Sequence, residues 1–183
     1  MVTCCESQGT RTYGALPEFV YSTQAKSGTG GGAVYVNLFV PSVYHGIGFT
    51  LTQRTGFPHN GSLSLSMSRN ATAATTEAAA TQQLMLRIPA WCTDSSVPVV
   101  IKDTTSGATV SVRSGVPGTY LAVELADRQA VEAHYEMSLR VSLYNGTGAP
   151  VDSFGCKARQ VVRAAVEWGP VLLAATYSTD PTW

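Results

Sequence analysis

Two adjacent cysteines, Cys4 and Cys5, are the residues whose types and spacing most directly suggest chemistry. A disulfide within the pair is difficult to close, because the peptide between neighbours is trans and both side chains would have to turn toward each other. Two neighbouring thiols are better placed to share a third partner, and a thiolate is both a nucleophile and a ligand for soft metals. Ordinary packing is the alternative, since free cysteine is among the most often buried residue types.

The other two cysteines, Cys92 and Cys156, stand far apart in unlike contexts. Sequence alone cannot choose among the pairings that four cysteines permit. A disulfide between Cys92 and Cys156 is one alternative, and two free thiols is the alternative that we favour.

The remaining candidates for chemistry favour structural roles. No two of the histidines stand at the spacing of a metal-binding pair, so we expect exposed imidazoles at His45, His59 and His134. Trp91 follows Pro89-Ala90 and could stack on a sugar, but a tryptophan at this place is more often an anchor in the core.

Composition excludes some classes of partner. The 183 residues carry 12 Lys and Arg against 12 Asp and Glu, with no basic run, so nothing indicates binding to nucleic acid or to an anionic membrane. No segment has the apolar length of a membrane span or the pattern of a signal peptide. The localisation stays unknown, although three glycosylation sequons, at Asn60, Asn70 and Asn145, weakly favour a secretory or extracellular compartment.

One helical segment precedes a series of strands. Apolar side chains at Tyr13, Leu16, Val20 and Tyr21 follow helical spacing, and Pro17 predicts a kink or a boundary between two short helices. The glycine-rich run that follows has no side chains to pack, which is typical of a linker.

Beyond the linker, short apolar or alternating segments are separated by turn residues, as in two packed antiparallel sheets. The fold class that we expect is therefore mainly β, an antiparallel β-sandwich preceded by a short helical segment. An Asn-Gly pair at 60–61 favours a hairpin, and the Ala- and Thr-rich residues 70–82 predict a loop. The expected strands cover residues 33–40, 48–55, 62–68, 83–89, 97–102, 108–113, 119–125, 137–143, 160–166 and 171–175.

An ordered set of segments resembles glycoside hydrolase family 127, the β-L-arabinofuranosidase-like proteins. The set comprises Thr3-Cys4-Cys5-Glu6-Ser7-Gln8-Gly9-Thr10-Arg11, Leu16-Pro17-Glu18-Phe19-Val20-Tyr21, and residues 34–42, 53–61, 86–91 and 168–172, which occur in the family's order. At 126–135 the chain departs from the pattern, because a tryptophan and a Gly-Asp turn are absent and strand alternation resumes only at Met137. Because of this departure, the resemblance does not predict the conformation of the local turn.

The resemblance implies a retaining glycosidase with a thiolate nucleophile. By position, Cys4 matches the nucleophile that attacks the anomeric carbon, and Cys4 and Cys5 match two ligands of a shared zinc ion. Zinc would keep the sulfur in its reactive thiolate form, while a carboxylic acid protonates the leaving oxygen. The substrate class that the family implies is an arabinofuranosyl glycan.

The same resemblance implies that the site is incomplete in this chain. The family's other zinc ligands and its acid come from an (α/α) barrel upstream, and three residues precede Cys4 here. Glu6 and Glu18 could substitute, but we expect both to face solvent on the helix. Residues 1–25 are therefore expected to be a helical remnant of the barrel, and residues 33–178 the β-sandwich.

Two classes of function remain open. The chain could be the carboxy-terminal part of a glycoside hydrolase, inactive by itself, whose missing barrel is its intramolecular partner. It could instead be a non-catalytic accessory or carbohydrate-binding module. In either case, an apolar face without its barrel predicts self-association.

Overall fold

The computed structural model describes residues 4–24, 32–69, 81–145 and 162–173. The chain forms two compact units, Met1–Glu136 and Met137–Trp183, so the expected β-sandwich range of 33–178 extends over both. No helix in the described ranges is long and apolar enough to cross a bilayer.

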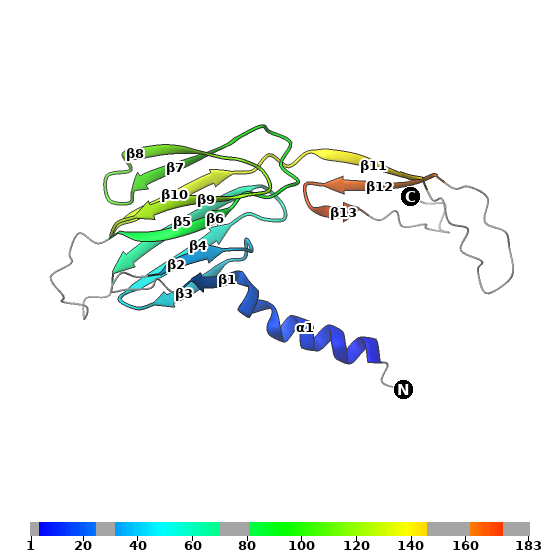
Figure 1. Ribbon diagram of the computed structural model, residues 1–183, viewed down its shortest axis with the longest axis horizontal. Helices are drawn as coiled ribbons and strands as arrows, with labels where there is room; N and C mark the ends of the chain where they lie inside the picture. Colours follow the sequence, from blue (N-terminus) through cyan, green and yellow to red (C-terminus); the bar gives the residue numbers. More distant parts are fainter. Residues whose placement is uncertain (1–3, 25–31, 70–80, 146–161, 174–183) are drawn as a thin grey trace, which may run out of the picture. The chain divides into compact units, whose positions relative to one another are not determined.

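Figure 1 shows one helix followed by thirteen strands along the described part of the chain. In chain order they are α1 (Cys4–Val20), β1 (Tyr21–Gln24), β2 (Ala33–Val36), β3 (Ser42–Gly46), β4 (Phe49–Thr55), β5 (Ser62–Arg69), β6 (Gln82–Arg87), β7 (Val97–Asp103), β8 (Thr109–Gly115), β9 (Tyr120–Leu125), β10 (Gln129–His134), β11 (Leu139–Asn145), β12 (Val162–Trp168) and β13 (Val171–Leu173). The expected loop over residues 70–82 lies outside the described residues except for its last two positions.

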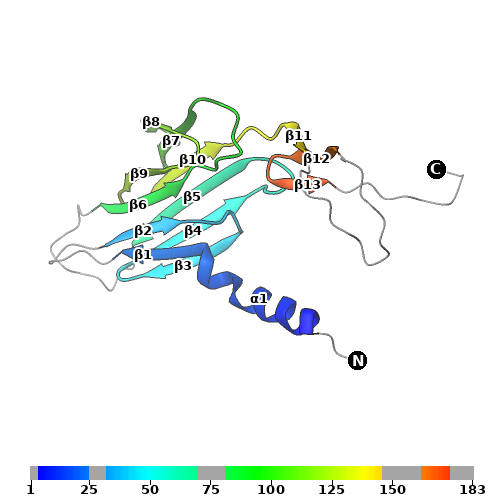
Figure 2. The same cartoon turned by 45° about the vertical axis from the view of Figure 1, so that its right-hand side comes forward.

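The first unit is a β-sandwich, which confirms the expected fold class. One sheet has the order β1-β2-β6-β9 and the other the order β3-β4-β5-β10-β7-β8 (Figure 2). The strand pairs are antiparallel except β2 and β6, which run parallel. A parallel pair cannot be joined by a hairpin, and here the chain passes through the other sheet between these two strands.

Alternation along the strands builds the core between the two sheets. In β5, the apolar side chains Leu63, Leu65 and Met67 are buried, whereas the serines between them are not. Successive side chains of a strand point to opposite faces, so one sequence pattern makes both a core face and a polar outer face. The core comprises Val34, Val36, Phe49, Leu51, Leu63, Leu65, Met67, Leu84, Leu86, Ile88, Cys92, Val97, Val99, Ile101, Val123, Leu125, Val131, Ala133 and Tyr135.

Two expectations about the beginning of the chain need correction. The helix α1 starts at Cys4 and continues through Pro17, with no boundary between two helices. Pro17 stands in the last turn, where its ring removes only one hydrogen bond of the helix. The chain then enters β1 at Tyr21, a strand that sequence analysis missed, because β1 is defined by its pairing with β2.

Sequence analysis also missed β3 and β10. β10 covers most of the segment in which the family pattern was absent, yet it is a central strand between β5 and β7. Its apolar residues Ala130, Val131 and Ala133 are small but buried. Neighbours on both sides therefore impose the strand, although its own sequence signal is weak.

Aromatic rings close one end of the sandwich. The Tyr135 ring lies stacked on Phe39, with 4.8 Å between the centroids, and also contacts Trp91 edge to face. Trp91 is partly buried and packs against the core, as expected of an anchor. Gly61 lies against this cluster, where a side chain would collide with the Tyr135 carbonyl oxygen.

The second unit contains a three-stranded antiparallel sheet with the order β11-β12-β13. On one face, Arg140 donates two hydrogen bonds to Glu167, at 3.0 and 2.7 Å, and Ser142 donates a third to the same carboxylate. Register and alternation gather apolar residues on the other face: Leu139, Val141, Leu143, Ala164, Val166, Trp168, Val171 and Leu173. The two faces of this sheet therefore differ strongly in polarity.

Candidate functional site

The cysteine pair lies at the first turn of α1, where the backbone of Cys4 begins the helix. Consecutive positions on an α-helix are about 100° apart around its axis, so Cys4 and Cys5 occupy neighbouring faces at this end. The first N–H groups of a helix have no partner within it, and their partial positive charge favours an anion such as a thiolate. The backbone at this end of α1 therefore favours the thiolate form of a cysteine.

The last turn of α1 is attached to the sandwich by Asn37, a residue that sequence analysis did not single out. The Asn37 backbone N–H donates to the Val20 carbonyl oxygen at 3.0 Å, and its side-chain amide donates to Ser22 Oγ at 3.1 Å. The Tyr120 hydroxyl in turn donates to Asn37 Oδ1 at 2.7 Å. Asn37 therefore joins the helix end, β1 and β9 through hydrogen bonds.

A metal site built from the described side chains alone is not present. No group of three or more His, Cys, Asp or Glu is found among them that could hold an ion, and Glu18 is exposed on α1, as expected. Tetrahedral zinc takes four ligands, or three and an open position. Cys4 and Cys5 fit two of these positions by donor chemistry, so further ligands would have to come from another part of the protein.

Cys92 has the opposite character to a reactive cysteine. Its side chain is a free thiol, 7% exposed, among core residues at the end of the sandwich. Burial, with a smaller contribution from Asp94, raises the pKa of the Cys92 thiol to about 11. The thiol therefore stays protonated at neutral pH. Cys156, its alternative disulfide partner, lies outside the described residues.

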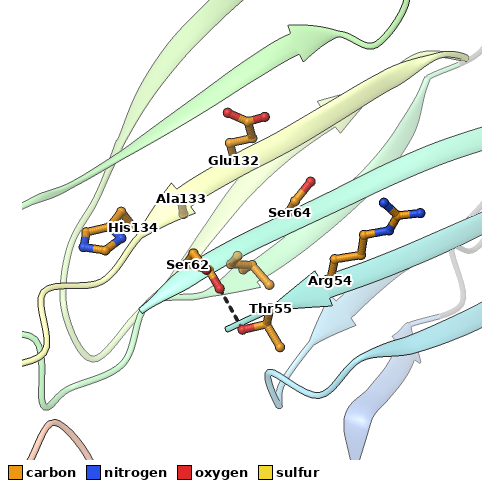
Figure 3. Close-up of a pocket in the computed structure, with 8 residues that line it drawn as sticks. Arg54, Thr55, Ser62, Ser64, Glu132, Ala133 and His134 are labelled. Atoms are coloured by element: carbon orange, nitrogen blue, oxygen red, sulfur yellow. Dashed lines mark hydrogen bonds between the residues drawn. The ribbon is translucent and has the colours of Figure 1, made fainter. Parts of the chain in front are cut away.

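The outer face of the six-stranded sheet carries a shallow polar pocket (Figure 3). Arg54, Ser64 and Glu132 are opposite one another on β4, β5 and β10, so their side chains project from the same face. His134 and Ser62 continue the pocket toward one end of the sheet. A second, adjoining pocket extends over Lys102 and other residues of β7 and its turn.

Most charges around these pockets are already paired. Lys102 Nζ lies 2.6 Å from Glu132 Oε2. The Asp103 carboxylate accepts hydrogen bonds from the backbone and side chain of Ser106, which lowers its pKa. Within the described part of the chain, no ion pair or hydrogen bond engages the Arg54 guanidinium. The pocket thus offers one unpaired cation and a row of serine hydroxyls.

All three histidines are exposed, as sequence analysis predicts. His134 is one of the residues that line the pocket on the outer sheet face. Arg87 donates a hydrogen bond to the Asn37 carbonyl oxygen at 3.2 Å, so this arginine supports the attachment of α1.

Comparison with protein families identifies the sandwich. Residues 33–137 match the model of the β-L-arabinofuranosidase GH127 middle domain. The chain belongs to glycoside hydrolase family 127. The resemblance noted in the sequence is thereby confirmed, and the matched range covers β2 through β10. Among proteins with curated descriptions, none matches this sequence.

Solved structures of GH127 proteins share this fold. A GH127 β-L-arabinofuranosidase from Geobacillus stearothermophilus T6 is 21% identical, with a TM-score of 0.57 over 92% of this chain and 23% of its own. A GH127 β-arabinofuranosidase, BT3674, is 25% identical, with a TM-score of 0.62 over 92% of this chain and 25% of its own. A protein described as a glycoside hydrolase is 22% identical, with a TM-score of 0.59, over 92% of this chain and 24% of its own. This GH127 chain thus spans about a quarter of the length of these structures.

Proposed function

We propose that this chain is the carboxy-terminal part of a retaining β-L-arabinofuranosidase in which Cys4 is the nucleophile. Membership of family 127 supports the reaction class. The single observation that carries the residue assignment is the position of the vicinal cysteines at the first turn of α1, ahead of the sandwich. In this proposal residues 1–25 belong to the barrel that precedes the sandwich.

Cys4 would act by a double displacement. Its thiolate sulfur forms a bond to the anomeric carbon of an arabinofuranosyl unit while the glycosidic bond breaks, and an acid from elsewhere in the protein protonates the leaving oxygen. Water then replaces the sulfur at the same carbon, which returns the thiolate and retains the configuration. Cys4 and Cys5 would hold a zinc ion, which when bound supplies positive charge that keeps the sulfurs deprotonated.

A polypeptide that carries a barrel ahead of α1 tests the assignment. The variant Cys4→Ser should lower kcat for a nitrophenyl β-L-arabinofuranoside by about 10³-fold or more, because the hydroxyl is a far weaker nucleophile at neutral pH. The matched control, Cys92→Ser, replaces a thiol that is buried and protonated, and should leave kcat unchanged in protein that remains folded. Full activity of the Cys4→Ser variant would contradict the proposal.

The chain of 183 residues alone should not hydrolyse the same substrate. In this proposal the chain supplies only two of the zinc ligands, and the described residues contain no group of three or more His, Cys, Asp or Glu that could hold the ion. We expect no stoichiometric zinc by metal analysis, and little change in Tm for the variant Cys4→Ser. Turnover by the purified chain, or one tightly bound zinc per chain, would show that the site is complete without a barrel.

A non-catalytic carbohydrate-binding module is the second candidate. The observation that favours it is the pocket on the outer sheet face, where serine hydroxyls and the unpaired Arg54 could bind sugar hydroxyls. Titration of the chain with arabinofuranosyl oligosaccharides, followed by NMR, should then shift the signals of β4, β5 and β10. Absence of any shift at millimolar sugar would eliminate this candidate.

The three N-glycosylation sequons are the basis on which we also propose a secretory location. Asn60 is exposed in the turn between β4 and β5, as a glycosylated asparagine must be. A change in mobility of the native protein after enzymatic removal of N-glycans would support this location.

A further inference from the structure

The turn between β4 and β5 holds an asparagine whose side-chain oxygen accepts two hydrogen bonds. Asn60 Oδ1 accepts a hydrogen bond from the Ser62 backbone N–H at 3.0 Å and another from Ser62 Oγ at 2.6 Å. Both donors belong to one residue, and both point at the oxygen of the side-chain carbonyl. Two donors on a carbonyl oxygen stabilise the negative charge that develops there when a nucleophile attacks the carbon.

The nucleophile for such an attack is supplied by the next residue. The backbone nitrogen of Gly61 can close a five-membered ring on the side-chain carbonyl carbon of Asn60, and Gly61 has no side chain to obstruct the ring. In the described part of the chain, no hydrogen bond occupies the Gly61 N–H or the side-chain nitrogen of Asn60, which would be the leaving group. The asparagine is also exposed, so water can reach it.

We propose that Asn60 is a site of spontaneous deamidation in the folded protein, assisted by Ser62. The Gly61 nitrogen loses its proton and bonds to the Asn60 side-chain carbon, while the bond to the side-chain nitrogen breaks and ammonia leaves. The resulting succinimide is opened by one water molecule, at either carbonyl. Opening at one carbonyl gives aspartate, and opening at the other gives isoaspartate, in which the main chain runs through the side-chain carbon.

The isoaspartate product would loosen one end of the sandwich. Gly61 accepts a hydrogen bond from the Tyr135 backbone N–H at 2.9 Å, and its Cα packs directly against the Tyr135 carbonyl. An additional main-chain carbon before Gly61 displaces this contact and the start of the pairing between β5 and β10. Ageing at Asn60 therefore acts on the aromatic cluster around Tyr135.

Peptide mapping by mass spectrometry tests the proposal. The purified chain, produced without glycosylation, is incubated at mildly alkaline pH, and samples are analysed for conversion of Asn60 to aspartate and isoaspartate, which electron-transfer fragmentation distinguishes. A synthetic peptide of residues 57–64 provides the rate without tertiary structure. We expect both products at Asn60 in the folded chain, and a lower Tm in aged samples that contain isoaspartate.

Two variants test whether Ser62 assists the deamidation of Asn60 or whether exposure of Asn60 to water is sufficient. Ser62→Ala removes one of the two donors and should slow conversion of Asn60 by about threefold to tenfold, since the backbone N–H remains. Ser64→Ala, two residues further along the same strand and not in contact with Asn60, should leave the rate unchanged. An unchanged or faster rate in Ser62→Ala overturns the assistance by Ser62. No conversion in the folded chain, over a time in which the peptide converts completely, overturns the site itself.

Discussion

At the scale of single residues, a few positions at one end of the sandwich have roles that their types alone do not reveal. Gly61 is required because its Cα meets the Tyr135 backbone, and Tyr135 is almost fully buried, with its hydroxyl donating to the Arg87 carbonyl at 3.2 Å. Burial raises the pKa of both Tyr135 and Cys92. These residues stabilise the fold and are not reactive groups.

Replacement of Gly61 should be costly. The variant Gly61→Ala places a methyl group against the Tyr135 carbonyl oxygen. This oxygen belongs to the backbone, so it cannot move away without opening the turn. We expect the free energy of unfolding to fall by about 3 kcal/mol. The control Gly14→Ala, at an open helical position, should raise it by about 0.5–1 kcal/mol. Urea unfolding of both variants measures the difference, and equal stabilities would contradict the predicted collision.

Cys92 should resist alkylation by iodoacetamide in the folded state at neutral pH. Its pKa is raised, so the native state keeps a proton that the unfolded state loses. The stabilising effect is therefore complete below the ordinary thiol pKa and is lost as the pH rises toward about 11. Alkylation followed by peptide mapping, with and without denaturant, measures the protection. The raised pKa of Tyr135 also lowers the free energy of unfolding at high pH. The pH dependence of that free energy is therefore compared between wild type and Cys92→Ala, and the difference gives the contribution of the thiol. Rapid labelling of native Cys92 is the contrary result.

At the scale of elements, the attachment of α1 decides whether the cysteine pair has a defined place. The helix exposes Tyr13 and Phe19, so little of its own surface holds it. Its last turn is instead held through Asn37 and β1. Sequence patterns locate the helix but not β1, and the role of Asn37 in joining the two is evident only from the tertiary structure.

Loss of the Asn37 side chain should release the end of the helix. Asn37→Ala removes the side-chain hydrogen bonds to the Phe19 carbonyl oxygen and to Ser22, and the bond from Tyr120, and we expect a loss of about 2 kcal/mol in unfolding free energy. Tyr120→Phe removes only one of these bonds and should cost about 1 kcal/mol. Hydrogen exchange should show faster exchange for α1 in Asn37→Ala. Unaltered protection of the helix would argue that other contacts hold it.

At the scale of the whole molecule, the described residues form one well-covered core and one sheet that exposes apolar side chains. The second unit exposes Leu139, Val141 and Leu143 at 62%, 57% and 69%. Three strands with one bare apolar face are not expected to be stable in water without a covering layer. The predicted self-association therefore has a specific surface in the second unit.

The isolated chain should associate through this face. Leu143→Lys places a charge on it and should shift the chain toward monomer in light scattering. Leu172→Lys is the matched control, because Leu172 is similarly exposed, at 66% against 69%, but lies opposite Glu167 on the polar face. Association that persists in Leu143→Lys and disappears in Leu172→Lys would place the contact on the wrong face.

Much of the sandwich could be predicted from the sequence because one face of each strand is buried. The alternation in β4 and β5 specifies both the strands and their inward residues, so these elements were predicted almost to their ends. β10 and β1 were missed because their residues carry little periodic signal, and each becomes a strand through hydrogen bonds to its neighbours. Of the candidate site, the cysteine pair was evident, whereas the support through Asn37 depends on contacts between distant segments.

The sequence by itself determined the motifs of family 127, the two-faced strands and the thiol pair, because each depends on residue types at short spacing. Only the tertiary structure decided the central place of β10, the parallel pairing of β2 with β6 and the contact of Gly61 with Tyr135. These features join residues far apart in the chain, and hydrogen bonding and packing between them are set by the whole fold and not by any local pattern.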